Sequence, residues 1–271
     1  MKKIFYSICI NLFCLNGFGQ VPDTAINSIS YLFLHQRDTT SPSYYTEEMT
    51  LMFGRSSSVY ISSSKSFSDS LIRANVEQQL RDGQTLQLGM LSRNYTRQNY
   101  YQFFRNHLVK IESPFLSNTF IFDDTIPKIH WKVLEEFRII GNYKCQKATG
   151  FFAGRQYEAW FCPEFALNAG PWKLCGLPGL IFEANDSRNQ VKFVFNAISK
   201  MNGGLNTIAP SLLAIKTNRI DFKKMIKAYN VNPFAFANTS GLDIKVNKKL
   251  GPSMKSTINN PLEISDKIKI E

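Results

Sequence analysis

The stretch Gly176-Leu177-Pro178-Gly179-Leu180-Ile181 decides how this chain turns and where a strand begins. Proline presets φ at the second position of a turn, and glycine at the third position accepts the positive φ of a type II turn. Residues 180–184 then alternate with a two-residue period, so a strand follows the turn directly. The stretch contains no nucleophile, acid, base or metal ligand. It therefore predicts architecture and not a reaction.

Alternating apolar segments continue the strand pattern on both sides of this turn. Short turn-forming segments separate them, and successive antiparallel strands joined by short turns form a meander. The predicted strands are 29–34, 49–53, 58–62, 100–104, 119–122, 129–139, 143–152, 157–161, 180–184 and 191–198.

Two segments, 68–82 and 221–230, have helical spacing of apolar residues instead. We therefore expect a mainly β (α+β) fold, in which a curled antiparallel meander sheet packs against one or two helices. This architecture is similar to the half-barrel of periplasmic lipoprotein carriers, a likeness of fold that implies no function by itself.

Four further motifs accompany the turn, at 141–148 (GNYKCQKA), 154–164 (GRQYEAWFCPE), 170–175 (GPWKLC) and 260–264 (NPLEI). In this order and spacing, the chain resembles the GLPGLI family of secreted proteins from Bacteroidota-type bacteria. The resemblance implies a secreted protein with a β-rich fold. Because the family has no established biochemical function, the resemblance carries over no catalytic residue.

Residues 1–19 have the features of a secretory signal peptide: two N-terminal lysines, an apolar segment, and small residues before a cleavage site at Gln20. The residues before Cys14 lack the small side chain that lipoprotein processing requires. No later segment is apolar enough to span a bilayer. We expect a periplasmic or secreted protein with a single domain over 20–271, whose basic C-terminal segment is partly flexible from residue 239.

The positive charge is concentrated near the C-terminus. The whole chain has a formal net charge of +11, and residues 192–271 hold 13 Lys and Arg against 5 Asp and Glu. Such a segment attracts anionic partners such as lipid headgroups or acidic proteins, although a solvated basic surface is the commoner meaning. No nucleic-acid-binding motif is present, so no nucleic-acid partner is expected.

Three cysteines follow the signal peptide: Cys145, Cys162 and Cys175. In an oxidising compartment one disulfide would leave one thiol over. A two-residue hairpin loop centred on 154–155 places Cys145 and Cys162 diagonally on neighbouring strands, which is poor geometry without a bulge. Because Cys162 stands where the resembling family often has threonine, we favour Cys145–Cys175. Three free thiols are the alternative.

The sequence shows no catalytic or metal-binding pattern. His35, His107 and His130 are more than twenty residues apart, and the acid pairs are neighbours in the chain, which point to opposite faces of a strand. Cys175 has no nearby histidine to activate it. We therefore expect no catalytic residue, metal or cofactor, and a hydrolase is disfavoured.

Aromatic residues gather in the predicted meander, where they line either a core or an apolar pocket. The candidate ligand face consists of Trp131, Trp160, Trp172, Tyr157 and Phe193. We expect a non-enzymatic binding protein for an apolar or amphipathic ligand such as a lipid. The alternative is an adaptor of outer-membrane machinery, such as a TonB-dependent receptor, that docks through the turn at 176–181.

Overall fold

The computed structural model describes residues 23–82, 95–201, 206–233, 235–236 and 258–264 of the 271-residue chain. The expected signal peptide over 1–19, and most of the basic segment beyond 239, lie outside these described residues.

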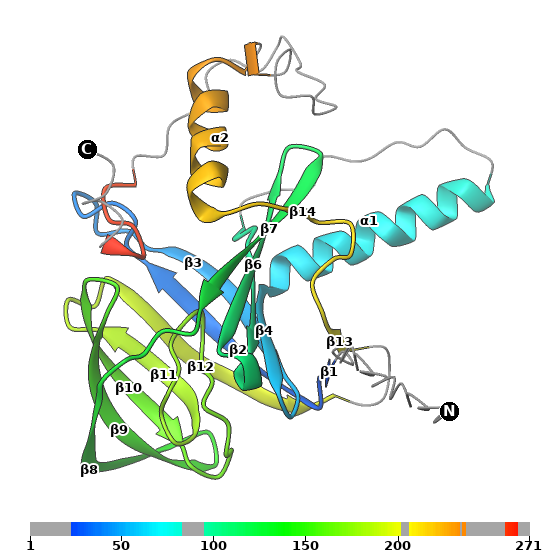
Figure 1. Cartoon of the computed structure of the whole chain (residues 1–271). Helices are drawn as coiled ribbons and strands as arrows, with labels where there is room; N and C mark the ends of the chain where they lie inside the picture. Colours follow the sequence, from blue (N-terminus) through cyan, green and yellow to red (C-terminus); the bar gives the residue numbers. More distant parts are fainter. Residues whose placement is uncertain (1–22, 83–94, 202–205, 234, 237–257, 265–271) are drawn as a thin grey trace, which may run out of the picture.

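The described chain is mainly β, with two α-helices and one 3₁₀ turn (Figure 1). The helical elements are α1 (Ser63–Arg81), η1 (Phe104–Asn106) and α2 (Arg219–Val231). The strands are β1 (Asp23–Thr24), β2 (Asn27–His35), β3 (Tyr45–Phe53), β4 (Ser57–Ser62), β5 (Asn99–Phe103), β6 (Leu108–Phe115), β7 (Asn118–Thr125), β8 (Trp131–Ile140), β9 (Tyr143–Phe152), β10 (Arg155–Cys162), β11 (Leu180–Asp186), β12 (Val191–Lys200), β13 (Thr207–Ile208) and β14 (Ile215–Lys216).

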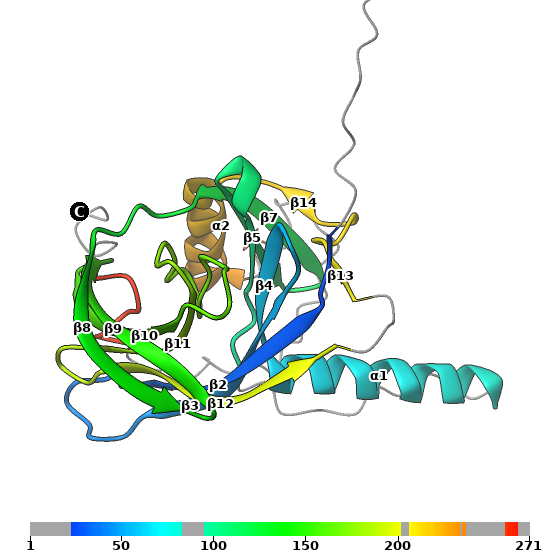
Figure 2. The ribbon, with the colours of Figure 1, turned by 90° about the horizontal axis from the view of Figure 1, so that it is seen from below.

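Twelve strands form one sheet in the order β14-β7-β6-β5-β4-β3-β2-β12-β11-β10-β9-β8. Strands β2 to β7 make one antiparallel meander and β8 to β12 make a second, while β14 adds a short parallel strand beside β7. The sheet curls strongly without closing into a barrel (Figure 2). The predicted mainly β fold with a curled meander is therefore confirmed.

The two meanders meet where β12 pairs with β2. This antiparallel pairing runs from Val191 opposite His35 to Lys200 opposite Asn27. Phe33 stacks on Phe193 across it, with ring centroids 5.1 Å apart. The β2–β12 pairing thus joins the two halves of the sheet through both the backbone and the core.

The loop between β10 and β11 supplies side chains to the core. Trp172, Leu174 and Leu177 are at most 2% exposed and belong to the same apolar cluster as the strands. The turn enters β11 within this cluster, where the hydroxyl of Tyr31 donates to the carbonyl oxygen of Ile181 at 2.7 Å. The loop is therefore part of the core and not a surface excursion.

Helix α2 covers β7. The ring centroid of Phe222 lies 5.6 Å from that of Phe120 and 5.4 Å from that of Phe122. The N-cap of α2 is Asn218, three residues before Asp221 and before the predicted start of the helix. The two side chains form a reciprocal box, in which Asn218 accepts from the backbone N–H of Asp221 and donates to its carboxylate.

Helix α1 begins five residues earlier than predicted and projects away from the sheet at its far end (Figure 1). Ser62 caps it, because its hydroxyl accepts from the backbone N–H of Lys65 at 2.9 Å. Ser68, the first residue of the predicted helix, lies inside α1.

The turn within 176–181 differs from the predicted type II turn. Positive φ occurs at Gly176 (+92°) and not at Gly179. The N–H of Gly179 donates to the carbonyl of Leu177 at 2.8 Å, which closes a γ-turn around Pro178. Gly179 is needed for a different reason: a Cβ there would overlap the backbone carbonyl of Cys162. Close backbone approach, and not positive φ, selects this glycine.

Strand β8 is the end strand of the sheet and does not bury the residues that its alternation predicted. Val133, Phe137 and Ile139 are 43%, 53% and 65% exposed. The register with β9 shifts between Val133 and Phe137, and no strand lies on the outer side of β8 among the described residues. Alternation thus identified the strand but not its buried side, because Leu134 and Ile140, which have the other parity, are less exposed than these residues.

We expect Gly179→Ala to lower the free energy of unfolding by about 1–3 kcal/mol, because the added methyl must push away the Cys162 carbonyl. Urea unfolding of the mature chain measures this difference. Pro178→Ala is the control, since Pro178 is exposed and its loss should cost less than about 1 kcal/mol. An unchanged unfolding midpoint for Gly179→Ala would contradict the close-approach explanation.

Candidate functional site

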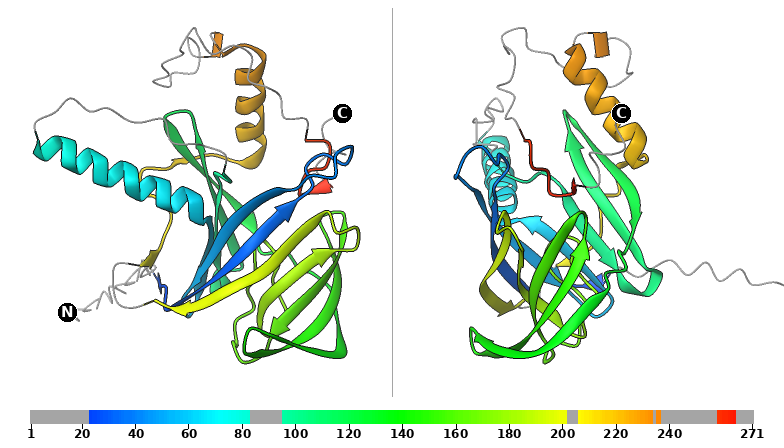
Figure 3. Two further views of the ribbon diagram at one scale, coloured as in Figure 1. Left: turned by 180° about the vertical axis from the view of Figure 1, so that it is seen from behind. Right: turned by 90° about the vertical axis from the view of Figure 1, so that its left-hand side faces the viewer.

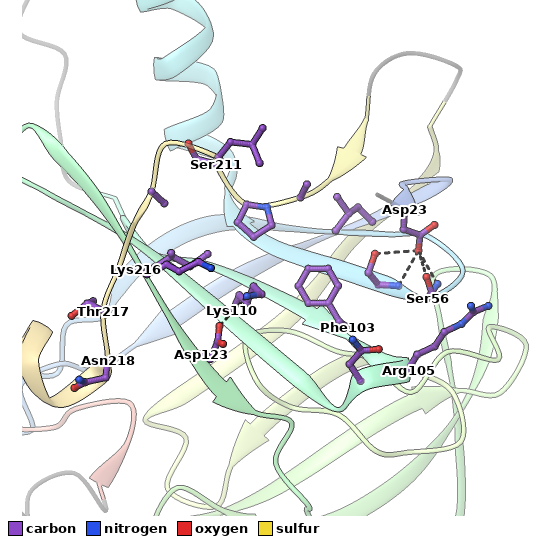
Figure 4. A pocket seen from close by; sticks show the side chains of 18 residues that line it. Asp23, Ser56, Phe103, Arg105, Lys110, Asp123, Ser211, Lys216, Thr217 and Asn218 are labelled. Carbon is purple, nitrogen blue, oxygen red and sulfur yellow. Dashed lines mark hydrogen bonds and ion pairs between the residues drawn. The ribbon is translucent and has the colours of Figure 1, made fainter. Parts of the chain in front are cut away.

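A groove of about 1000 Å³ lies between strands β5–β7 and the segment 206–218 that crosses them (Figure 4). Lys110 and Ile121 line it, and they alternate along their strands with the core residues Val109 and Phe120. Successive side chains of a strand point to opposite faces. The groove therefore opens on the face of the sheet that is turned away from the main core.

The walls of the groove combine apolar and cationic side chains. Phe103, Ile208 and Leu212 are among the apolar ones, and Lys110 and Lys216 lie together on one side (Figure 4). The Lys110 ammonium is 3.1 Å from the carboxylate of Asp123. Lys216, by contrast, makes no ion pair with any residue that the structure describes, and its side chain is exposed. This arrangement suits a ligand with an apolar body and an anionic group.

Asp23 fixes the other end of the groove. One of its carboxylate oxygens accepts hydrogen bonds from the backbone N–H groups of Ser56 and Ser57, at 2.7 and 2.9 Å, and from both hydroxyls at 3.1 Å. Burial raises the pKa of Asp23, but the hydrogen bonds from Ser56 and Ser57 outweigh it and hold the pKa below its ordinary value. This carboxylate therefore holds the β1 segment in place and is occupied by its own chain.

A second polar site lies where the tail segment 258–264 docks (Figure 3). The buried guanidinium of Arg155 donates to the carboxylate of Asp186 at 2.6 Å, to the side-chain oxygen of Asn260 at 2.7 Å and to the backbone oxygen of Pro261 at 2.8 Å. Arg155 and Asp186 are 3% and 1% exposed. Burial of such a pair requires that every hydrogen bond be satisfied, and the tail supplies the remaining acceptors.

A network of four charged side chains continues this docking. The ammonium of Lys173 lies 2.8 Å from Asp124 and 2.7 Å from Glu263, and Arg219 contacts the same two carboxylates at 2.5 and 2.9 Å. Burial raises the pKa of Asp124, but Lys173 and Arg219 outweigh it and lower the pKa. Because each charge has two partners, the network ties loop, strand, helix and tail together and leaves no group free to act as an acid or base.

His35 lies beside the tail, with its Nε2 2.8 Å from the backbone oxygen of Asn260. The pKa of His35 is lowered to about 4. Burial is the main cause, and the nearby positive charge of Arg155 acts in the same direction, whereas the hydrogen bond to Asn260 opposes it. The ring is thus neutral at pH 7 and its Nε2–H donates to the tail. This is a structural role for a histidine.

The structure separates the five aromatic residues predicted as a ligand face. Tyr157, Trp172 and Phe193 are at most 2% exposed in the core. Trp160 is 9% exposed, and its ring contacts the side chain of Arg138. Trp131 is half-buried and donates from its Nε1 to the carbonyl of Cys175 at 2.8 Å. They fill space within the fold and do not line one open face.

The six residues of the turn are similarly buried, apart from Gly176 and Pro178. They are positioned by the core and by backbone bonds such as that from Ile181 N–H to the Ala169 oxygen at 2.9 Å. The turn therefore offers little side-chain surface for docking.

The predicted Cys145–Cys175 disulfide is not formed, and Cys145, Cys162 and Cys175 are buried free thiols. The Cys175 thiol instead lies 3.7 Å from the carbonyl oxygen of Pro127. The sequence also centred the β9–β10 turn one residue too late, which is why Cys145 and Cys162 were expected to lie diagonally. The Cys145 thiol faces Cys162. Burial is the main cause that raises the pKa of Cys145 to about 12, and the charge of Cys162 and a hydrogen bond with it add to the effect.

The described residues contain no group of three or more His, Cys, Asp and Glu side chains that is placed to hold a metal ion. They also contain no helix with the length and apolarity needed to cross a membrane. Sequence reasoning missed the groove, because Phe103, Lys110 and Lys216 come from three segments with no shared motif. The exposed Leu212-Leu213 pair was the one local signal for it.

No protein-family model and no curated protein matches this sequence. Among solved structures, the chain is similar to PNGF-II in two crystal forms, with TM-scores of 0.52 and 0.51 and sequence identities of 12% and 11%. Each match covers 75% of this chain and 33% of the PNGF-II chain, so the chain spans a third of the length of these neighbours. At this identity the likeness concerns the fold alone.

We expect acid to destabilise the protein partly through His35. Its pKa is 6.5 when unfolded and about 4 when folded, so between these values the unfolded chain binds a proton that the folded chain excludes. The stabilisation is complete above pH 6.5 and is lost as the pH falls towards 4, by about 2–3 kcal/mol. Urea unfolding at about pH 7 and about pH 4.5 measures this loss.

His35→Gln is the matched variant, because glutamine still donates to Asn260 but does not titrate. Its loss of stability between the two pH values should be smaller than that of the wild type. Equal losses would show that His35 does not titrate as its burial implies.

Proposed function

We propose that this protein is a non-enzymatic binding protein of the periplasm or the extracellular space, and that it binds an amphipathic anion in the groove beneath segment 206–218. The observation that carries the proposal is Lys216, which is exposed beside an apolar groove and makes no ion pair within the part of the chain that the structure describes. The secretory features of residues 1–19 support the compartment.

The groove supports both parts of such a ligand. An anionic head beside Lys216 would meet a cation that pairs with no carboxylate among the described residues, with Lys110 close by (Figure 4). The apolar chain would lie along Phe103 and Ile208. Leu212 and Leu213 are 101% and 92% exposed at the rim, and burial against a ligand would remove this apolar surface from water.

The groove is a better ligand site than the concave face of the sheet. We expected a ligand there to contact Trp172, Tyr157 and Phe193. These side chains are instead buried members of the main apolar cluster. A ligand at that face would have to displace the loop between β10 and β11. We therefore place the amphipathic ligand in the groove, on the opposite side of the sheet.

Titration calorimetry with lysophosphatidic acid, which has one acyl chain and a phosphate, tests this function. We expect Lys216→Glu to weaken binding at least about tenfold, because an anion then faces the phosphate. Lys132→Glu makes the same charge change on the exposed face of β8 and should leave the affinity unchanged. Equal affinity for an uncharged monoacylglycerol, or an unchanged affinity in Lys216→Glu, would overturn the proposal.

The open edge of β8 favours a second candidate, an adaptor that docks on an outer-membrane protein such as a TonB-dependent receptor. On this edge, next to the exposed Phe137 and Ile139, no strand of the described residues pairs with the outer backbone groups of β8. Such an edge can accept a strand from a partner. It offers more accessible surface than the turn at 176–181, from which only Gly176 and Pro178 are exposed.

Binding to an immobilised TonB-dependent receptor from the same bacterium tests the adaptor. We expect Ile139→Glu to abolish binding, because a charge would then enter the apolar contact, whereas Val231→Glu, at a still more exposed position on α2, should not. Binding that survives Ile139→Glu would exclude the β8 edge as the docking surface.

A further inference from the structure

The hairpin of β9 and β10 sets two cysteines against each other. Its turn consists of Ala153 (φ 51°) and Gly154 (φ 80°), and positive φ at both central residues defines a tight two-residue loop. Arg155 pairs with Phe152, and the register continues without a shift to Phe161 opposite Gln146. The next pair in this register is Cys162 and Cys145.

This register suits a cross-strand disulfide. Directly opposed residues of an antiparallel pair have Cα atoms about 4.5–5.5 Å apart and share a face of the sheet. Disulfides need Cα atoms about 4.4–6.8 Å apart. Both side chains are 0% exposed, and the Cys162 thiol is among the groups that act on Cys145. The two sulfur atoms therefore meet without a change of backbone register.

Cys175 is committed elsewhere. It lies in the loop before the turn, 2% exposed, with its thiol directed at the carbonyl of Pro127 at 3.7 Å. Burial raises its pKa to about 12. It is therefore the thiol that remains when the other two react.

We propose that Cys145 and Cys162 are a disulfide-forming pair that is oxidised by a disulfide-bearing oxidant while the β9–β10 hairpin is still open. One cysteine thiolate attacks the oxidant and forms a mixed disulfide, and the first oxidant thiolate leaves. The second cysteine thiolate attacks the mixed disulfide, forms the Cys145–Cys162 bond and expels the second oxidant thiolate. The oxidant gains two electrons and the two protons that the cysteine thiols lose.

The timing follows from burial. In the closed hairpin neither sulfur is accessible, and only a thiolate attacks a disulfide. Oxidation therefore precedes closure, and the closed reduced protein resists it. Once formed, the bond crosslinks β9, the neighbour of the edge strand β8, to β10.

Non-reducing peptide mapping tests the pairing, because trypsin places the three cysteines in three different peptides: 145–147, 156–173 and 174–188. The unfolded, reduced mature protein is refolded with oxidised glutathione, alkylated and digested. We expect peptides 145–147 and 156–173 to be linked, with Cys175 alkylated. A link between 145–147 and 174–188, or alkylation of all three cysteines, would overturn the proposal.

Two variants separate this pairing from a general effect of refolding. Cys175→Ser should keep the link and should melt at a higher temperature before reduction than after it. Cys162→Ser should give no link and no such difference. A difference that persists in Cys162→Ser would contradict the proposal, and the wild-type map decides the pairing if that variant does not fold.

Discussion

A sheet that curls without closing must cover its concave face with parts of the chain from outside the sheet, and this requirement organises the whole molecule. The loop between β10 and β11 provides Trp172, Leu174 and Leu177, and helix α2 provides Phe222. Apolar burial supplies the main stabilisation of these covers. Their positions are then fixed by charge, because Lys173 of the loop and Arg219 of the helix share the same two carboxylates.

The tail segment acts as a clasp across the junction of the two meanders. Asn260 donates to the carbonyl of Gln36 just beyond β2 at 2.7 Å, and accepts from Arg155 of the second meander. The backbone oxygen of Asn260 also accepts a hydrogen bond from the His35 ring. A buried Arg155–Asp186 pair alone would leave donors unsatisfied, so the motifs 154–164 and 260–264 are coupled by a hydrogen-bond requirement.

Sequence periodicity predicted most of the fold, and its failures have physical causes. It found β9 to β12, where apolar side chains alternate and turn residues separate them. It missed β6, in which Val109 and Ile111 alternate with Lys110 and Glu112 but the alternation ends at Ser113 and Pro114, so that the period is short. It set the β9–β10 turn one residue late, because it did not anticipate positive φ at Ala153, a residue that rarely adopts it.

The sites were less predictable than the strands, because they depend on which distant segments meet. Nothing local in the sequence shows that Lys173 meets Glu263, or that Lys216 pairs with Ile121 of β7. The aromatic residues were correctly located in the meander, but abundance alone did not distinguish a core from a pocket. Only the position of the loop between β10 and β11 decides that question.

The β2–β12 junction also sets the order in which the chain can fold. Most neighbouring strands within a meander are close in sequence, so their hairpins can form early and independently; the exceptions are the β4–β5 pair, which is separated by α1, and the β10–β11 pair. Phe33 and Phe193, by contrast, are 160 positions apart, and closing so long a loop costs entropy before any contact is gained. The junction should therefore be the slow step, and the tail can dock only after it, because its partners lie on both halves. The clasp then acts on unfolding: it must detach before the halves can separate.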